Sequence, residues 1–139
     1  MDRNRRFEVM AAVDPQPLLE LAEAVLAGTE VSIVTPPRVG TLLLRLREPV
    51  DGKLFNAGEL LVTEAQVGIG PHLGYAMRLG RAPEATLAAA VLDAAVEANH
   101  PLTPYVLAQL ECLLEAETAR QRAAWQAVAP TRVSFDEMA

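Results

Sequence analysis

Residues 59–69 have the sequence ELLVTEAQVGI, and residues 74–79 have the sequence GYAMRL. In each segment two sets of side chains alternate along the chain, which is the period at which residues of a β-strand reach the same face. The glycine-rich residues 68–74 connect the two segments. A phosphate-binding loop would be followed by a helix, whereas a strand follows here, so we expect a hairpin connection.

Two further strands are expected upstream. Residues 30–35 are short and β-branched, and Pro36-Pro37 is expected to end them. Residues 41–47 place three leucines on one face, and Asp51-Gly52 after them is a hairpin signal. The four segments predict a four-stranded, mainly antiparallel meander sheet.

Helices are predicted before and after the strands. Asp14 is placed to cap one helix, Pro83 suits the first turn of another, and Thr103 with Pro104 begins a third of roughly 38 Å. The fold class is α+β, a single domain of residues 1–139 in which N-terminal and C-terminal helices pack the sheet, with a long C-terminal helix and an extended tail. The predicted helices cover residues 5–13, 15–28, 83–98 and 103–128.

The composition favours a cytoplasmic domain that is completed by a partner. Of the 139 residues, 51% are hydrophobic but only 4% are aromatic, so the core must be built from leucine, valine and alanine. The net charge is −6 and the basic residues are scattered, which argues against a free-standing nucleic-acid binder. No apolar run approaches the roughly 20 residues of a membrane span, and the basic N-terminus lacks the apolar region of a secretory signal.

Residues that commonly carry catalysis or bind metals are few and far apart in the sequence. Cys112 is the only cysteine, too few for an iron–sulfur cluster, and it is expected in the core. The two histidines, His72 and His100, lack zinc-site spacing. No catalytic, cofactor-binding or metal-binding residue is therefore predicted. The alternative left open is a stand-alone anion- or nucleotide-binding domain that uses His72, Arg78 and Arg81.

The last predicted helix has two unlike halves. Its first half carries leucines that suit packing on the sheet, whereas residues 115–126 are mostly Glu, Arg, Gln and Ala around Trp125. One interpretation is a solvated helix end, and the other is a segment that binds another subunit with Trp125 as an anchor. Residues 131–135 are expected to add to a partner's sheet as an extended strand. The predicted partner-binding region is residues 115–139, with Trp125, Val128, Val133 and Phe135 at the interface.

A set of residues, densest between positions 55 and 93, has a specific order and spacing. Its members are Phe55, Gly58, Glu59, Val62, Thr63, Ala65, Gly74, Tyr75, Gly80, Arg81, Asp93, Arg132, Val133, Phe135 and Met138. This pattern resembles that of the G subunit of the bacterial carbon–phosphorus lyase system, which breaks down phosphonates. The tail departs from the family pattern, since Phe135 is followed by Asp136 rather than by a second phenylalanine.

The resemblance implies a hetero-oligomeric complex with the H, I and J subunits, acting with the L subunit. In that family the G, H, I and L subunits convert MgATP and an alkylphosphonate into an α-D-ribose 1-alkylphosphonate 5-triphosphate, with release of adenine. The I subunit is taken to carry the nucleosidase-like chemistry, and the J subunit carries the iron–sulfur cluster. The resemblance therefore implies a non-catalytic or accessory subunit of a transferase complex, with no cofactor of its own and no binding to nucleic acid or membrane.

Overall fold

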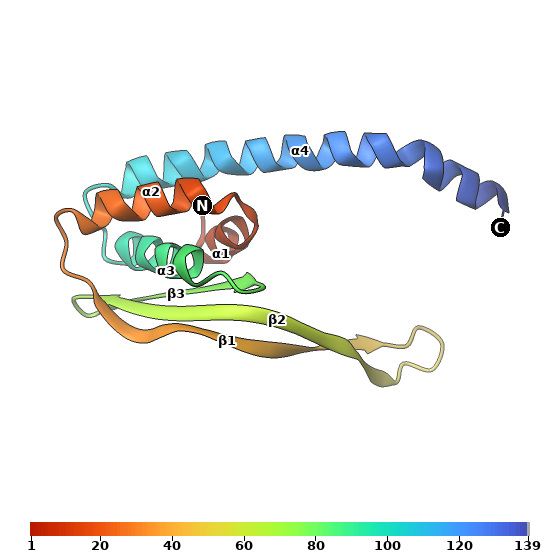
Figure 1. Ribbon diagram of the computed structural model, residues 1–139, viewed down its shortest axis with the longest axis horizontal. Coiled ribbons are helices and arrows are strands. Elements are labelled where there is room, and N and C mark those ends of the chain that lie inside the picture. The colour runs from red at the N-terminus through yellow and green to blue at the C-terminus, as the bar shows by residue number, and fades with distance from the viewer. Residues whose placement is uncertain (139) are drawn as a thin grey trace.

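The computed structural model describes the backbone of residues 1–138 and the side chains of residues 1–128. This part of the chain forms a helical layer on one face of an antiparallel sheet, so the α+β class is confirmed (Figure 1). The elements, in chain order, are α1 (Arg3–Ala12), α2 (Pro15–Leu26), β1 (Ser32–Arg47), β2 (Leu54–Ile69), β3 (His72–Leu79), α3 (Pro83–Glu97) and α4 (Thr103–Met138).

The described backbone has three strands rather than the four that the sequence predicts. β1 covers both of the first two predicted segments, and Pro36-Pro37 lies inside it. Proline is tolerated there because β1 is an edge strand, paired with β2 on one side only. The register moves from Thr35 opposite Gln66 to Arg38 opposite Glu64, so a bulge absorbs the extra residue of β1.

The strands differ in length, and this difference positions the candidate site. The sheet order is β1-β2-β3 with antiparallel neighbours; β1 and β2 each have 16 residues, whereas β3 has 8. β3 pairs with β2 from His72 opposite Ile69 to Leu79 opposite Val62. The β1–β2 hairpin therefore extends beyond the end of β3 (Figure 1).

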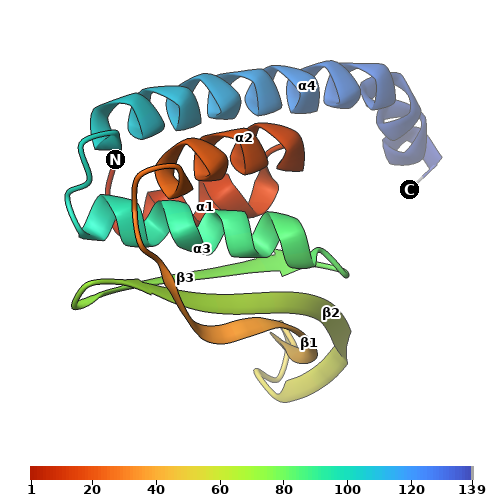
Figure 2. The ribbon, with the colours of Figure 1, turned by 60° about the vertical axis from the view of Figure 1, so that its left-hand side comes forward.

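α3 lies between the sheet and the other helices (Figures 1 and 2). It lies close to β3 because the facing residues are small: a Cβ added to Gly74 would lie 2.2 Å from the carbonyl oxygen of Ala90. α1 and α2 begin at aspartate caps, since the side chains of Asp2 and Asp14 accept hydrogen bonds from the backbone amides of Arg5 and Gln16.

The core lies between the sheet, α3 and the inner faces of the other helices. It is built from aliphatic side chains, as the composition predicts. No helix in the described part of the chain has both the length and the apolarity of a bilayer span. Fully or almost fully buried members are Leu18, Val25, Ala65, Val67, Ala89, Ala90, Leu92, Ala94, Val106 and Leu110.

α4 begins at Thr103, as predicted, but it continues to Met138. Its 36 residues span about 54 Å at the rise of an α-helix. The predicted extended tail, residues 131–135, is helical instead, because backbone groups with no neighbouring strand pair within their own segment. Val133 and Phe135, predicted at the interface, lie outside the described side chains.

Candidate functional site

The outer part of the β1–β2 hairpin, residues 39–61, exposes a large group of apolar side chains; we call it the hairpin arm. Ten of them are between 39% and 85% exposed. Soluble monomers rarely expose so large a contiguous apolar patch, and such patches commonly mark interaction sites. The ten are Val39, Leu42, Leu43, Leu44, Leu46, Val50, Leu54, Phe55, Leu60 and Leu61.

Both faces of the hairpin arm carry exposed leucines. Leu42, Leu43 and Leu44 follow one another in β1, so they point alternately to the two faces, and each is more than 40% exposed. Leu60 and Leu61 repeat this arrangement on β2. An antiparallel sheet with one face in water normally carries polar residues on that face. The two faces differ, however: Leu42, Leu44 and Leu46 line up on one face, opposite Leu60, Gly58 and Phe55. The other face mixes Leu43 and Leu61 with Arg45, Arg47 and Glu59. The face of Leu42 is therefore the one that most favours contact with another protein.

The tip of the arm is polar and is fixed by its own hydrogen bonds. The carboxylate of Glu48 accepts from the amide of Val50 at 2.8 Å, and Arg47 donates to the carbonyl oxygen of Gly52 at 2.7 Å. Gly52 has a φ of +69°, which glycine adopts without strain. The predicted hairpin turn therefore lies here and closes the arm with a preformed shape.

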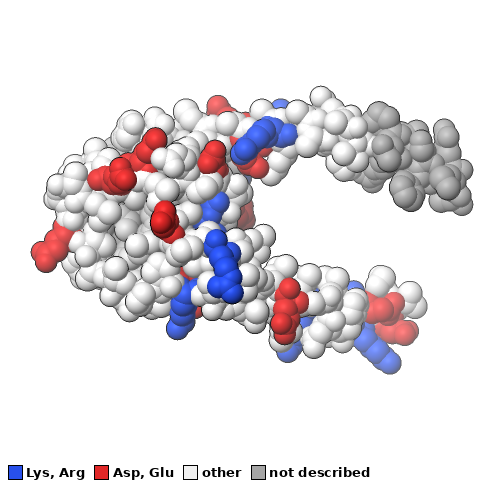
Figure 3. Space-filling view, in the orientation of Figure 1, with Lys and Arg blue, Asp and Glu red and all other residues white. Residues whose placement is uncertain are grey.

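A hollow separates the hairpin arm from α4 (Figure 3). Trp125 and Val128, two predicted interface residues, lie on the outer half of α4 and are 55% and 51% exposed. At the root of the arm, α1 and the sheet line a half-open cavity of about 580 Å³. The cavity is mainly apolar, and its lining includes Phe7, Met10, Leu42, Val62, Met77 and Leu79.

Asp93 is one of the residues that carry the family resemblance, a set that we call the resemblance pattern, and the structure gives it a structural role. Its side chain is fully buried. Oδ1 accepts from Nη2 and Nε of Arg6 at 2.7 Å and 3.0 Å, and Oδ2 accepts from Nη2 of Arg3 and the amide of Tyr75, both at 2.9 Å. The hydrogen bond from Arg3 to this carboxylate raises the pKa of Arg3. Asp93 thus ties α3 to α1 and β3.

Sequence reasoning missed Arg6, whose side chain is only 4% exposed. The signal was present: Arg6 lies three and four residues before Val9 and Met10, the spacing that puts all three on one helix face, and that face is buried. A buried arginine requires acidic partners, and Arg6 has two, Asp93 and Glu97, the latter at 2.6 Å.

Thr63 and Gly80, also in the resemblance pattern, shape the exit from β3. The hydroxyl of Thr63 donates to the carbonyl oxygen of Gly80 at 2.7 Å and accepts from the amide of Ala82 at 3.0 Å. Gly80 has a φ of +78°, which turns the chain out of the sheet. These contacts end β3 and start α3, so the two positions serve the fold.

Tyr75 takes part in a chain of polar side chains on the sheet. Its hydroxyl donates to Oε2 of Glu64 at 2.8 Å, and Nε of Arg38 donates to Oε1 of the same carboxylate at 2.7 Å. Burial and the hydrogen bond to Glu64 raise the pKa of Tyr75 to about 12, and the hydrogen bonds from Tyr75 and Arg38 lower the pKa of Glu64. The ring of Phe7 packs edge-on against Tyr75, with centroids 6.4 Å apart. A phenol held neutral in this way supports the fold rather than acid–base chemistry.

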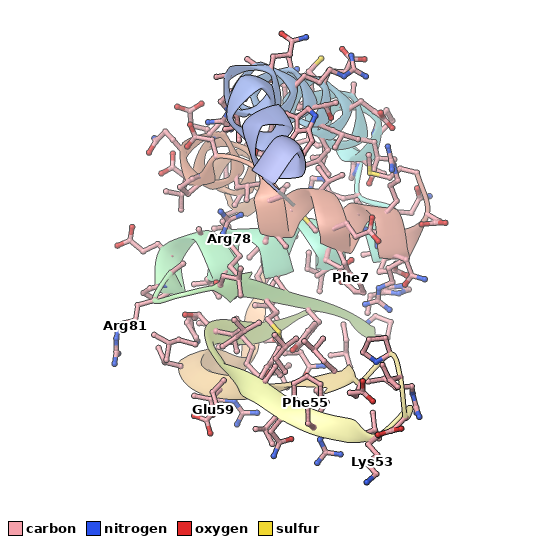
Figure 4. All side chains as sticks on the ribbon, turned by 90° about the vertical axis from the view of Figure 1, so that its right-hand side faces the viewer. Phe7, Lys53, Phe55, Glu59, Arg78 and Arg81 are labelled. Carbon is pink, nitrogen blue, oxygen red and sulfur yellow. The ribbon has the colours of Figure 1, made fainter. Side chains whose placement is uncertain are left out.

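Four positions of the pattern, Phe55, Gly58, Glu59 and Arg81, are exposed on the arm or beside it, whereas Val62 and Ala65 are buried (Figure 4). Phe55 is 48% exposed, and Glu59 is exposed four residues further along β2. Gly58 has a φ of +156° and lies where the β1–β2 register shifts. The side chains of Arg132 and Phe135 lie outside the described part. The described residues of the pattern therefore fall into two groups. One group, which includes Asp93 and Thr63, stabilises the fold, and the other, which includes Phe55 and Glu59, is exposed on the arm.

The structure does not bring together the residues of the alternative anion site. His72 begins β3, whereas Arg81 follows its end, a separation of about 20 Å along a strand. Arg78 lies between them, but its guanidinium donates to the carbonyl oxygens of Met10 and Val13. Burial lowers the pKa of Arg78. Arg78 thus holds the C-terminal end of α1, and Figure 4 shows it apart from Arg81.

Cys112 is exposed on α4, which corrects its expected place in the core. The reason is its position on the helix: Val106 and Leu110 define the buried face, and Cys112 follows Leu110 by two residues, outside the three- or four-residue spacing of that face. Within the part of the chain whose side chains are described, no three His, Cys, Asp or Glu residues form a group that could hold a metal ion.

Comparison with known proteins gives a family. The family model described as phosphonate metabolism protein PhnG matches residues 1–139, the whole length of the chain. No curated protein matches the chain.

Proposed function

The chain belongs to the family of phosphonate metabolism protein PhnG, and from this premise we propose that it is a non-catalytic subunit of the carbon–phosphorus lyase core complex. The family gives it a role in phosphonate metabolism. Its specific task would be to support the synthase step, in which MgATP and an alkylphosphonate give α-D-ribose 1-alkylphosphonate 5-triphosphate and adenine. The partners would be the H, I, J and L subunits, in the cytoplasm.

The observation that carries this proposal is the hairpin arm. Its exposed apolar side chains form a row on one face, with Leu42, Leu44 and Leu46, and Leu43 and Leu61 add to them on the other face. Obligate interfaces are more apolar than transient ones and bury about 2,000 Å² or more. An arm of this kind suits permanent burial in a complex.

The charged residues of the domain body support an accessory role. Arg6, Asp93 and Arg78 are occupied in holding the helices to the sheet. An iron–sulfur cluster does not fit this chain, because its one cysteine, Cys112, supplies a single thiolate where a cluster needs several. We therefore place the cluster and the MgATP-dependent chemistry on the partner subunits.

Co-expression with the I subunit of the same organism tests the proposal. Size-exclusion chromatography with light scattering should show a stoichiometric complex of the two chains. A variant that carries Leu44→Ser and Phe55→Ser in the arm should remain a separate species, while Leu26→Ser on α2, a site of similar exposure at 46%, should assemble as the wild type does. If the wild-type chain elutes apart from the I subunit, the proposal is wrong.

A separate experiment tests the alternative that the chain is a stand-alone anion- or nucleotide-binding domain. Calorimetric titration of the isolated chain with ATP should give no micromolar binding. Micromolar binding that is lost in both His72→Ala and Arg81→Ala would favour the anion-binding domain instead, since only that hypothesis assigns these two residues a ligand.

A further inference from the structure

β2 is twice as long as the strand that flanks it on one side. β3 pairs with β2 only as far as Leu79 opposite Val62, and Gly80 then turns the chain toward α3. Among the described residues, none pairs with this side of β2 from residue 54 to residue 60, a stretch that we call the open edge of β2. Natural proteins normally cover or charge such an edge, because it templates pairing with another chain.

One hydrogen bond identifies the backbone groups that face the open edge. The carbonyl oxygen of Leu61 accepts from the amide of Gly80 at 2.7 Å, so Leu61 faces the β3 side of β2. Alternate residues of an antiparallel strand face the same side, so Glu59 presents its amide and carbonyl to the open edge. Leu43 lies directly opposite Glu59 and faces the other way, toward the outer edge of β1.

The surroundings of the open edge are apolar. Val62 and Leu79, the last pair formed by β2 and β3, line the cavity of about 580 Å³ at the root of the arm. Leu60 continues the row of Val62 on the same face of β2 and is 39% exposed. A strand added at the open edge would therefore place alternate side chains beside the cavity and beside Leu60.

Exposed cations stand at both ends of the open edge. Arg81 lies at the corner where β3 ends, and Lys53 lies at the tip of the arm, one residue before β2 begins. In Figure 4, which looks down the length of the arm, Glu59 and Phe55 appear between these two labelled side chains. Carboxylates on a partner would complement the two cations and fix its register, more than they would add affinity.

We infer that the open edge of β2 binds an extended segment of a partner subunit, which adds a strand to the sheet in line with β3. The segment runs antiparallel to β2, the commoner pairing, and carries apolar side chains at alternate positions. An acidic residue near its amino end lies beside Arg81, and another near its carboxyl end lies beside Lys53. This inference rests on the proposed function, because it specifies how the arm binds its partner.

The outer edge of β1 is less suited to pairing with a strand of a partner. Pro36-Pro37 interrupts the hydrogen-bonding groups of that strand next to the base of the arm, because proline has no amide to donate. The outer edge also lacks a neighbouring strand end to define where an added strand begins. The open edge of β2 has both a boundary, at Gly80, and a row of available backbone groups.

Hydrogen exchange resolved to single amides tests the inference on the full chain. The probes are the isolated chain and the complex obtained by co-expression with the I subunit. We expect the amide of Glu59 to exchange at least about tenfold more slowly in the complex, because strand pairing engages it directly. The amides of Thr41 and Leu43, on the outer edge, should change much less. Equal protection of both edges, or protection of Leu43 alone, overturns the inference.

Three variants separate backbone pairing from side-chain contact. Glu59→Pro removes the amide at the open edge, Glu59→Ala keeps that amide, and Thr41→Pro removes an amide at the outer edge. We expect Glu59→Pro to weaken the complex at least about tenfold, and the other two to stay within about threefold of the wild type. Equal weakening by Glu59→Ala would assign the effect to the carboxylate and overturn strand addition.

The outcomes distinguish this inference from the proposed function. A stable complex in which Glu59 still exchanges as in the isolated chain overturns strand addition and leaves the subunit role intact. Failure of the wild-type chain to form any complex overturns both. Protection of Glu59 in the isolated chain that grows with protein concentration would identify the occupant as a second copy of this chain, and would also overturn the inference.

Discussion

Arg6 of α1 and Asp93 of α3 form a buried ion pair, with Nη2 of Arg6 2.7 Å from Oδ1 of Asp93. The two residues are 87 positions apart in the sequence, and their side chains are 4% and 0% exposed. The same carboxylate also accepts from the amide of Tyr75 in β3. One buried carboxylate therefore holds α1, α3 and β3 together. The hairpin arm extends from the same sheet, on β1 and β2.

Asp93→Ala should destabilise the isolated domain by about 3–5 kcal/mol, because it leaves the guanidinium of Arg6 buried without its main partner. Urea denaturation followed by circular dichroism measures the loss. Arg5→Ala is the matched control, since Arg5 lies next in α1 but is exposed, and its effect should stay within about 0.5 kcal/mol. Similar stabilities for the two variants would contradict the structural role of Asp93.

Gly74→Ala should also destabilise the domain, by about 1–3 kcal/mol, because the added methyl group overpacks the contact between β3 and α3. The new Cβ would lie 2.2 Å from the carbonyl oxygen of Ala90 and 2.3 Å from the amide nitrogen of Ala94, so α3 must move. Thermal unfolding measures the effect. At Gly28, where nothing lies within 4 Å of an added Cβ, alanine should be neutral or slightly stabilising.

The sequence predicts much of this fold because its signals are local. Asp14 as a cap, Pro83 in a first turn and the two-residue period of residues 59–69 each depend on neighbours in the chain, and the structure has all three features. Pro36-Pro37 misled the strand assignment because proline ends a central strand but not an edge strand, and which strand lies at an edge depends on the whole sheet.

The candidate site was harder to predict, because the alternation of apolar residues in the sequence does not indicate which strand faces stay exposed. A row of leucines such as Leu42, Leu44 and Leu46 is typical of a buried strand face. Each of them is nevertheless more than 40% exposed, because β3 stops before it reaches them and the helices do not cover the arm. Phe55 and Glu59 entered only through the family resemblance. Their place on an uncovered arm follows from the unequal lengths of β2 and β3, which no local signal fixes.

The domain should lose stability at high pH through Tyr75. Below pH 10 the phenol is protonated in both the folded and the unfolded chain, so its contribution is complete. Between pH 10 and about 12 the unfolded chain releases the proton while the folded chain keeps it, which favours unfolding. Urea denaturation across this range should show a fall in stability that is smaller in Tyr75→Phe.

Near-ultraviolet absorbance gives a direct control for that prediction. The chain has two tyrosines, so Tyr105→Phe leaves Tyr75 as the only source of the tyrosinate signal. Half-ionisation should then fall near pH 12, and adding Glu64→Gln should lower it, because that change removes the charge that opposes ionisation. An ordinary value near 10 in the folded protein would contradict the hydrogen-bonded environment of Tyr75.

Trp125→Ala should weaken complex formation about tenfold or more while leaving the isolated fold intact. Large aromatic side chains dominate the energetics of many interfaces, and Trp125 is 55% exposed on the outer half of α4. Size-exclusion chromatography measures assembly, and thermal unfolding measures the fold. Gln126→Ala, the neighbouring exposed position, should have little effect on either. A loss of folding with unchanged assembly would contradict an interface role for Trp125.

Serine substitutions in the hairpin arm should raise the solubility of the isolated chain and weaken its assembly with a partner. Leu60 and Leu61 point to opposite faces of β2 and are 39% and 42% exposed, so Leu60→Ser and Leu61→Ser each test one face. If a partner covers both faces, either change removes apolar contact area at the interface and should cost about 1.5–3 kcal/mol of binding, a weakening of tenfold or more. Light scattering at high protein concentration measures the gain in solubility, and co-purification measures assembly.

The two single substitutions also decide how the arm is buried. Equal losses of affinity indicate that the partner encloses the ribbon. A loss from only one of them indicates that the partner lies on that face, and that the opposite face is covered by something else or stays in water. Unchanged assembly in both variants would show that the arm is not part of the interface. The exposure of its leucines would then need another explanation. The wild-type exposures of the two side chains differ by only a few per cent, so a difference in effect would report the partner rather than the isolated fold.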